Sequence, residues 1–174
     1  MQPSKEEIII RRGTANDIKS LYSLVEENAI HHNLEPSAVQ LNATQMLIDF
    51  TGERPSFLFF VAETEEKIVG AAIYYYTYST FKGKSLYLED LIITKVYRSK
   101  SIGKLLMQVL AEEAVQNDSQ KMKWQVAEFN ERAIKFYENK MDAELDNDWI
   151  NCELNRTQLE EIGEDILEEE TVLA

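Results

Sequence analysis

Hydrophobic and polar positions along the chain follow two different periods, and each change of period marks an element. Apolar residues recur every three or four positions over about 18–29, 37–50, 101–117 and 131–139, which predicts four amphipathic helices. Runs that are β-branched or alternate at every second position predict strands at 8–10, 57–63, 67–78, 85–94, 122–127 and 148–154. The order β-α-α-β-β-β-α-β-α-β shows neither an internal repeat nor a long linker. It predicts one α/β (α+β) domain built on a mixed sheet.

The residues between these segments support the same boundaries. Thr14 has the character of an N-cap for the first helix, and Asp17, three residues later, is the acid of a capping box. Short turns at 65–66 and 81–84 separate the three central strands, so these strands are expected to pair as antiparallel neighbours. We therefore expect a single domain over 1–174, with its core at about 8–154 and an acidic helix or tail at about 157–174.

The composition and the net charge limit which classes of partner and substrate are expected. The chain has 174 residues, of which 44% are hydrophobic, so one domain can bury a sizeable core. Its net charge is −13, and seven of the 31 acidic residues lie within 157–174, where there is no Lys or Arg. Such a surface repels nucleic acid and anionic membranes, so neither is expected as a partner. A cationic substrate suits it better.

The single cysteine, Cys152, excludes an intrachain disulfide and indicates a reducing compartment. It lies in an alternating apolar run, so we expect it to pack in the core rather than to act as a nucleophile. The first residues lack the pattern of a secretion signal, and no apolar run approaches the roughly 20 residues that span a bilayer. The expected location is the cytoplasm.

The most informative stretch runs from Tyr87 to Leu106. A strand that carries Glu89 and Asp90 leads into a short basic loop of small residues, and a helix begins at once. This arrangement directs main-chain N–H groups and the positive end of the helix dipole at one point, which favours a phosphate. Adjacent residues on a regular strand face opposite sides, so only one of the two carboxylates is expected to reach a substrate.

Three segments in order carry a family resemblance. The loop Arg98-Ser-Lys-Ser-Ile-Gly103 resembles the acetyl-CoA loop of the GNAT N-acetyltransferase superfamily. Residues 79–90 and 130–137 resemble two signatures of the diamine (spermidine/spermine) acetyltransferases and their thialysine-acetylating relatives. The likeness extends over about 8–154. It implies a GNAT-like fold, acetyl-CoA as co-substrate and a homodimer. Two histidines alone make a poor metal site, so no metal is expected.

The resemblance also implies roles for individual residues. Tyr137 matches the general acid that protonates the departing CoA thiolate, and Glu89 matches a residue that contacts the acceptor amine, directly or through water. Trp149 matches an aromatic residue of the acceptor pocket, so the implied substrate-binding set is His31, His32, Glu89, Asp90 and Trp149. The implied cofactor-binding set is Leu91, Ile92, Ile93, Arg98, Ser99, Lys100, Ser101, Ile102, Gly103, Lys104, Asn130, Glu131, Arg132, Ala133 and Lys140.

The chain departs from the family pattern at two places. Ser101 stands where the loop usually has its middle glycine, which adds a Cβ near the pyrophosphate. His31-His32 replaces an aromatic–acid pair. A protonated histidine would repel a polyamine, so a smaller amine or an amino acid becomes a stronger candidate for the acceptor. The expected reaction is acetyl transfer to a primary amine of a small cationic acceptor (a polyamine, diamine or thialysine-like amino acid), by direct attack in a ternary complex. The alternatives are a protein lysine or N-terminal acetyltransferase and a non-catalytic CoA-binding or adaptor protein.

Overall fold

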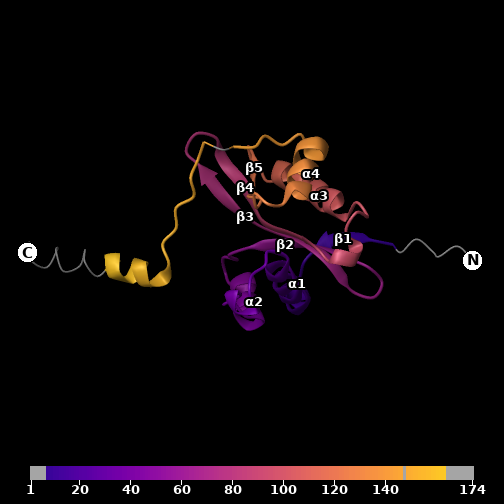
Figure 1. Cartoon of the computed structure of the whole chain (residues 1–174), viewed down its shortest axis with the longest axis horizontal. Coiled ribbons are helices and arrows are strands. Elements are labelled where there is room, and N and C mark those ends of the chain that lie inside the picture. The colour runs from indigo at the N-terminus through magenta and orange to yellow at the C-terminus, as the bar shows by residue number, and fades with distance from the viewer. Residues whose placement is uncertain (1–6, 147, 164–174) are drawn as a thin grey trace, which may run out of the picture. The chain divides into compact units, whose positions relative to one another are not determined.

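The computed structural model (Figure 1) describes residues 7–146 and 148–163, which fall into two compact units divided between Asn130 and Glu131. The first unit contains most of the elements. In order they are β1 (Ile9–Arg12), η1 (Ala15–Asp17), α1 (Ile18–His31), η2 (Pro36–Ala38), α2 (Ala43–Thr51), β2 (Leu58–Glu63), β3 (Ile68–Ser79), β4 (Gly83–Ile93), η3 (Lys95–Tyr97), α3 (Ile102–Gln116) and β5 (Met122–Lys123). The second unit contains α4 (Glu131–Met141) and a helix over residues 156–163.

The strands of the first unit form one mixed sheet in the order β1-β2-β3-β4-β5. The first four are antiparallel neighbours, and β5 runs parallel to β4. The parallel pairing is short, because only Leu86 and Tyr87 of β4 lie opposite residues of β5. Among the described residues, β4 beyond Tyr87 therefore has no strand neighbour on that side. The α/β class, the mixed sheet and the antiparallel central strands are confirmed.

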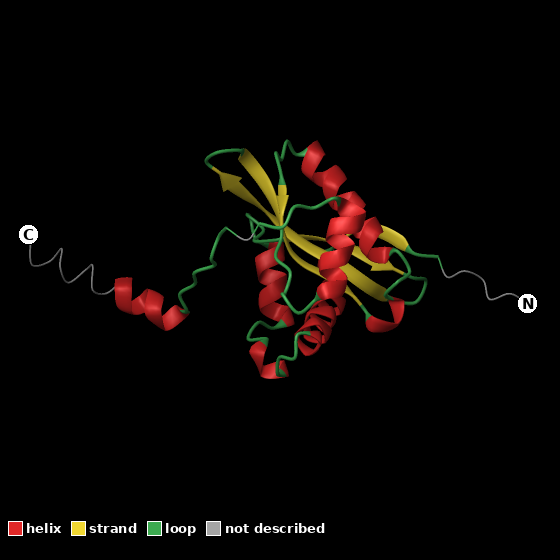
Figure 2. Cartoon of the chain, turned by 45° about the horizontal axis from the view of Figure 1, so that its top comes forward, coloured by secondary structure: helices red, strands yellow, loops and turns green. Residues whose placement is uncertain are grey.

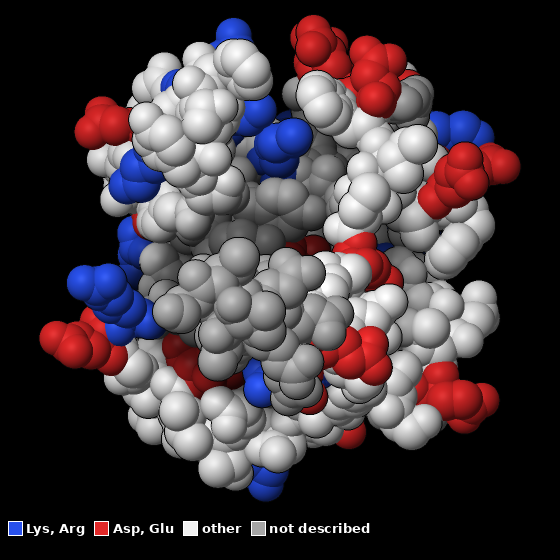
Figure 3. All heavy atoms as spheres, turned by 90° about the vertical axis from the view of Figure 1, so that its left-hand side faces the viewer, with Lys and Arg blue, Asp and Glu red and all other residues white. Residues whose placement is uncertain are grey.

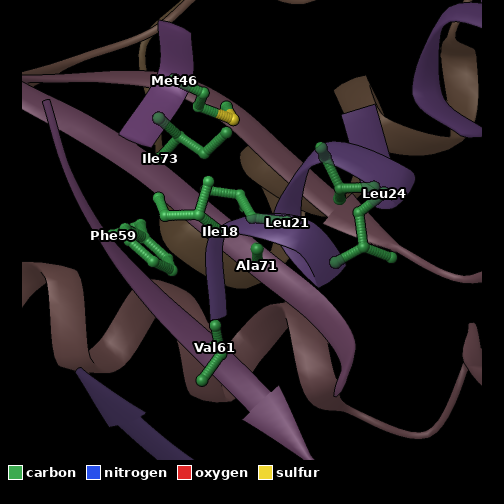
Figure 4. Close-up of a cluster of buried hydrophobic side chains, with 9 residues drawn as sticks. Ile18, Leu21, Leu24, Met46, Phe59, Val61, Ala71 and Ile73 are labelled. Carbon is green, nitrogen blue, oxygen red and sulfur yellow. The ribbon is translucent and has the colours of Figure 1, made fainter. Parts of the chain in front are cut away.

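The alternation of apolar residues in β2 and β3 fills both faces of the sheet. On one face, α1 and α2 pack against the strands, and the side chains in Figure 4 point toward one another across this layer. This cluster comprises Ile18, Leu21, Leu24, Met46, Phe59, Val61, Ala71, Ile73 and Ile92. The alternate residues, such as Phe60 and Tyr74, stack on the other face, which α3 covers (Figure 2).

An ion pair between a buried carboxylate and an exposed arginine joins α3 to the sheet. The carboxylate of Glu113 is almost fully buried and accepts hydrogen bonds from Arg12 of β1 and from Tyr76 of β3. Asn117, one turn further along α3, also donates to it. Since a buried carboxylate is costly unless its oxygens are paired, this network explains how a charge can lie under the helix.

Several boundaries differ from the sequence expectation. The capping box of Thr14 and Asp17 is present, as expected. The helix expected over 37–50 is divided, because Asn42 caps a helix of its own by accepting from the main-chain N–H of Gln45 at 2.9 Å. The strand expected over 122–127 is only two residues long. The expected acidic helix is present over 156–163, and the rest of that segment lies outside the described residues.

The last expected strand is wrong. Residues 148–154 are irregular, and Cys152 is exposed, so its expected role in packing is wrong as well. Alternation of apolar residues indicates only that a segment suits a strand. A strand also needs a neighbour to pair with, and the described part of the second unit contains no other strand. The described helices include none long and apolar enough to cross a membrane. On the face shown in Figure 3, acidic and basic side chains are both dispersed among uncharged ones.

Candidate active site

A β-bulge lies at the middle of the strand that carries the two predicted carboxylates. In the pairing of β3 with β4, Tyr74 lies opposite Leu88, whereas the preceding residue Ile73 lies opposite Asp90. Glu89 is therefore an extra residue in β4 without a partner in β3. A bulge of this kind bends its strand and turns side chains away from the regular alternation.

The bulge brings Glu89 and Asp90 to the same face of the sheet. Asp90 lies opposite Ile73, whose side chain belongs to the core under α1, and it accepts a hydrogen bond from Asn28 of α1 at 2.9 Å. Tyr75 and Tyr87 stack on each other on that same face. Burial raises the pKa of both tyrosines, and the nearby charge of Glu89 raises it further. The expectation that the two carboxylates face opposite sides is wrong, because the extra residue shifts the alternation by one.

Glu89 and Asp90 differ in their exposure and in their electrostatic surroundings. Burial raises the pKa of Asp90, and the neighbouring charge of Glu89 raises it further, while His32 and Asn28 act in the opposite direction. Glu89 is exposed, whereas Asp90 is half-buried. Burial also raises the pKa of Tyr75, and the charge of Glu89 adds to this effect. The exposed carboxylate is thus the one available to a cationic ligand.

The last turn of α1 lies beside these carboxylates. His32 packs edge-on against Phe129, with ring centroids 5.8 Å apart, and His31 packs edge-on against His32 at 5.5 Å. Burial lowers the pKa of His31, and the positive charge of Arg98 lowers it further. The lowered pKa favours the neutral ring, which reduces the expected repulsion of a polyamine at this residue.

The connection from β4 to α3 is fixed by its own contacts. Thr94 Oγ1 and the main-chain N–H of Lys95 both donate to the carboxylate of Glu27, at 3.0 and 2.9 Å. Arg98 donates from Nε to the carbonyl oxygen of Ile93 at 2.9 Å. These bonds hold the end of β4 and the start of the loop against α1.

Two residues of the loop adopt a left-handed conformation. Ser99 has φ 66° and Ser101, the N-cap of α3, has φ 65°, a region that favours glycine. The next residues, Ile102, Gly103 and Lys104, form the first turn of α3, whose N–H groups have no acceptor within the helix. The loop and the helix dipole can therefore direct several donors at one anion.

The remaining candidate residues are divided between the two units. Leu91 and Ile93 are half-buried and Ile92 is buried at the end of β4, and Lys100 lies over the ring of Tyr97 at 4.4 Å. Asn130 ends the first unit. In the second unit, Tyr137 is buried and its pKa is raised by burial to about 12. Glu131, Arg132 and Lys140 of α4 are exposed, Ala133 is half-buried, and Trp149 is 78% exposed.

The structure thus brings together, in the first unit, both histidines, both carboxylates, the end of β4 and residues 98–104. Tyr137 and Trp149 belong to the second unit. Sequence reasoning missed Glu27 and Asn28, although each precedes a candidate histidine by four residues and so shares its helix face. Among the described residues, no group of three or more His, Cys, Asp or Glu side chains is arranged to hold a metal ion.

Residues 19–142 match the Acetyltransferase (GNAT) family, and the chain belongs to this family of N-acetyltransferases. It is 30% identical over 167 residues to spermidine/spermine N(1)-acetyltransferase-like protein 1 of Homo sapiens, covering 91% of this chain and 24% of that protein. It therefore spans about a quarter of that relative's length.

A second relative and a solved structure are also similar to the chain. The chain is 29% identical over 138 residues to thialysine N-epsilon-acetyltransferase of Bos taurus, covering 75% of this chain and 81% of that protein. The fold matches the solved structure of an integron cassette protein of V. cholerae with a TM-score of 0.74, at 20% identity, over 90% of this chain and 97% of that one. The structural match concerns the fold alone.

Proposed function

We propose that the protein transfers an acetyl group from acetyl-CoA to a primary amine of a small cationic acceptor. The observation that carries this proposal is the bulge in β4. The bulge places Glu89 and Asp90 on one face of the sheet, beside Tyr75 and Tyr87. The strand that carries them leads into the loop 98–104, which suits a phosphate. Carboxyl groups beside aromatic rings suit an alkylammonium group. The named activities of the human and bovine relatives support the same class of acceptor.

Acetyl-CoA fits the residues at the other end of the strand. The first-turn N–H groups of α3 and the left-handed Ser99 and Ser101 supply donors for a pyrophosphate. The side of β4 beyond Tyr87, without a strand neighbour among the described residues, suits an extended pantetheine arm beside Leu91–Ile93. The co-substrate would supply the activated thioester carbonyl.

Residues of the chain itself remove the proton from the amine and stabilise the negative charge that develops on the carbonyl oxygen. An alkylammonium with a pKa near 10.4 is only about 0.04% neutral at pH 7, so the amine must lose a proton before it attacks. The exposed carboxyl group of Glu89 accepts that proton directly or through water. A main-chain N–H near Leu91 stabilises the oxyanion. No covalent enzyme intermediate is required, because the amine attacks the thioester directly.

Tyr137 is the proposed proton donor to the departing sulfur. With its pKa raised to about 12, the phenol is fully protonated at neutral pH. Complete transfer to a thiolate of pKa near 8.5 is uphill by about 3.5 units in this environment. Tyr137 therefore acts first as a hydrogen-bond donor to the sulfur as charge develops there, and gives up its proton only as the thiolate leaves.

The substitution Tyr137→Phe tests this assignment. We expect kcat to fall by about 100-fold or more, with the Kd of acetyl-CoA unchanged, because general acid catalysis contributes roughly that factor. Tyr78→Phe, at a tyrosine that is 76% exposed, is the matched control and should keep wild-type kinetics. Full turnover by Tyr137→Phe would remove Tyr137 from the mechanism.

A panel of amines, with products identified by mass spectrometry, tests the acceptor. Acetylation of spermidine, putrescine, thialysine or a comparable small amine is the expected result. Acetylation of lysine peptides alone would favour a protein acetyltransferase. Acetyl-CoA binding without acetylation of any amine would favour a non-catalytic role. The homodimer stays a prediction, which light scattering on the purified chain would test, and the cytoplasmic location stays a prediction too.

A further inference from the structure

The last turn of α1 is attached to the connection between β4 and α3 at several points. Glu27 accepts hydrogen bonds from Thr94 Oγ1 and from the main-chain N–H of Lys95. One helical turn further on, both ring nitrogens of His31 lie 3.5 Å from Nη1 of Arg98. The acceptor side and the cofactor side of the proposed site are therefore joined by direct contacts.

Arg98 occupies the central position in these contacts. Its Nε donates to the carbonyl oxygen of Ile93, the last residue of β4, while its Nη1 lies beside the imidazole of His31. The guanidinium thus bonds to the strand end on one side and lies beside α1 on the other. Arg98 opens the loop that continues into α3, so its side chain links the start of that loop to β4 and to α1.

The contact depends on the charge of His31. A neutral imidazole has a lone pair that can accept from a guanidinium, whereas an imidazolium beside it repels it. The charged and titratable groups facing His31 are Arg98 and Lys95 of the connection and Glu27 and His32 of α1. Only Glu27 favours the protonated ring, and burial together with the other three opposes it, so the pKa of His31 is lowered.

We propose that His31 is a positioning residue, which holds Arg98, and with it the loop 98–104, in the cofactor-binding form only while its ring is neutral. This inference rests on the proposed use of acetyl-CoA. It predicts that the enzyme loses affinity for CoA on acidification because the loop loses its support, and not because a group that touches the ligand has titrated.

Calorimetric titration with CoA between about pH 5.5 and pH 8 tests the proposal, because this range spans the ordinary pKa of histidine. We expect the wild-type Kd to rise about fivefold more at the acidic end than that of His31→Gln. That factor corresponds to about 1 kcal/mol, the repulsion of two unit charges some 4 Å apart in water. His31→Gln keeps a neutral acceptor and should bind CoA as wild type does at pH 8.

A second variant places a permanent positive charge at position 31. His31→Lys should bind CoA about fivefold more weakly than wild type even at pH 8, because its cation is permanent. The matched control is Ser20→Lys, which adds the same charge at an exposed position near the start of α1 and should bind as wild type does. Thermal melts of all variants show whether each is folded.

The outcomes separate this inference from the proposed function. If the folded wild-type chain binds no CoA at any pH, the proposed function fails. If it binds CoA but His31→Gln shows the same pH dependence, or His31→Lys binds as tightly as wild type, the positioning role is overturned. An NMR titration of His31 gives a second reading without cofactor, since Arg98→Gln should raise the His31 midpoint. An unchanged midpoint would also overturn it.

Discussion

Ser101 offers the sharpest test of how this loop is built. Its φ of 65° lies in the left-handed region, and its side chain makes no capping hydrogen bond to α3. For an L-residue other than glycine, that conformation costs roughly 1–2 kcal/mol. Glycine removes the cost, but it loses about 0.5–1 kcal/mol more chain entropy on folding. Ser101→Gly should therefore stabilise the protein by about 0.5–1 kcal/mol.

The matched variant is Ser101→Ala. It removes the same hydroxyl but keeps a Cβ, so the left-handed strain remains and no stabilisation is expected. Urea unfolding of the three proteins gives the free energies, and a gain of this size corresponds to about 1–4 °C in Tm for a protein of this length. CoA should bind Ser101→Gly at least as tightly as wild type, because no Cβ faces the pyrophosphate.

Three results would count against this reasoning. If Ser101→Gly is less stable than wild type, the left-handed strain in the loop is not real or the hydroxyl has a structural role. If Ser101→Ala gains as much stability as Ser101→Gly, the gain comes from loss of the hydroxyl and not from relief of the backbone. Weaker CoA binding by Ser101→Gly would show that a rigid loop matters more than space at the pyrophosphate.

The remaining predictions concern the core and the buried carboxylate. Leu21→Ala should reduce the free energy of unfolding by about 2–5 kcal/mol, because Leu21 has no exposed surface, whereas Ile48→Ala, at a residue that is 56% exposed, should cost much less in the same urea titration. At Glu113, burial raises the pKa, but the hydrogen bonds from Tyr76 and Arg12 outweigh it and lower the pKa overall. The stability that these bonds provide is present above the ordinary value of 4.5 and is lost as the pH falls through the lowered pKa. Glu113→Gln should therefore be less stable than wild type at pH 7, and the difference in Tm should shrink below about pH 4.5. A difference that stays constant down to about pH 3 would contradict this account.

Much of the fold follows from local pattern, and the errors have physical causes. The periods of β2, β3 and β4 and the capping box of Thr14 are encoded in neighbouring residues, so they could be read directly. The strand expected at 148–154 depends on a partner elsewhere in the chain, and alternation alone does not supply one. The two-residue length of β5 likewise reflects where its pairing with β4 ends.

The candidate site also combines features that local sequence predicts with features that depend on distant residues. The loop at 98–104 and the two carboxylates could be found from residue types and spacing. That Glu89 and Asp90 share a face could not, because a bulge is set by the register of two strands and not by either sequence alone. The lowered pKa of His31 depends on burial and on Arg98, 67 residues away, and was equally beyond a local pattern.

The most direct test of the central claim is the mass-spectrometric acetylation assay on wild type and Glu89→Gln, with acetyl-CoA and a small polyamine or diamine. The account predicts a singly acetylated amine with wild type. It predicts a much slower reaction with Glu89→Gln, although that variant should bind CoA with unchanged affinity. Equal rates for the two proteins, or no acetylated small amine from a wild-type protein that binds CoA, would contradict it.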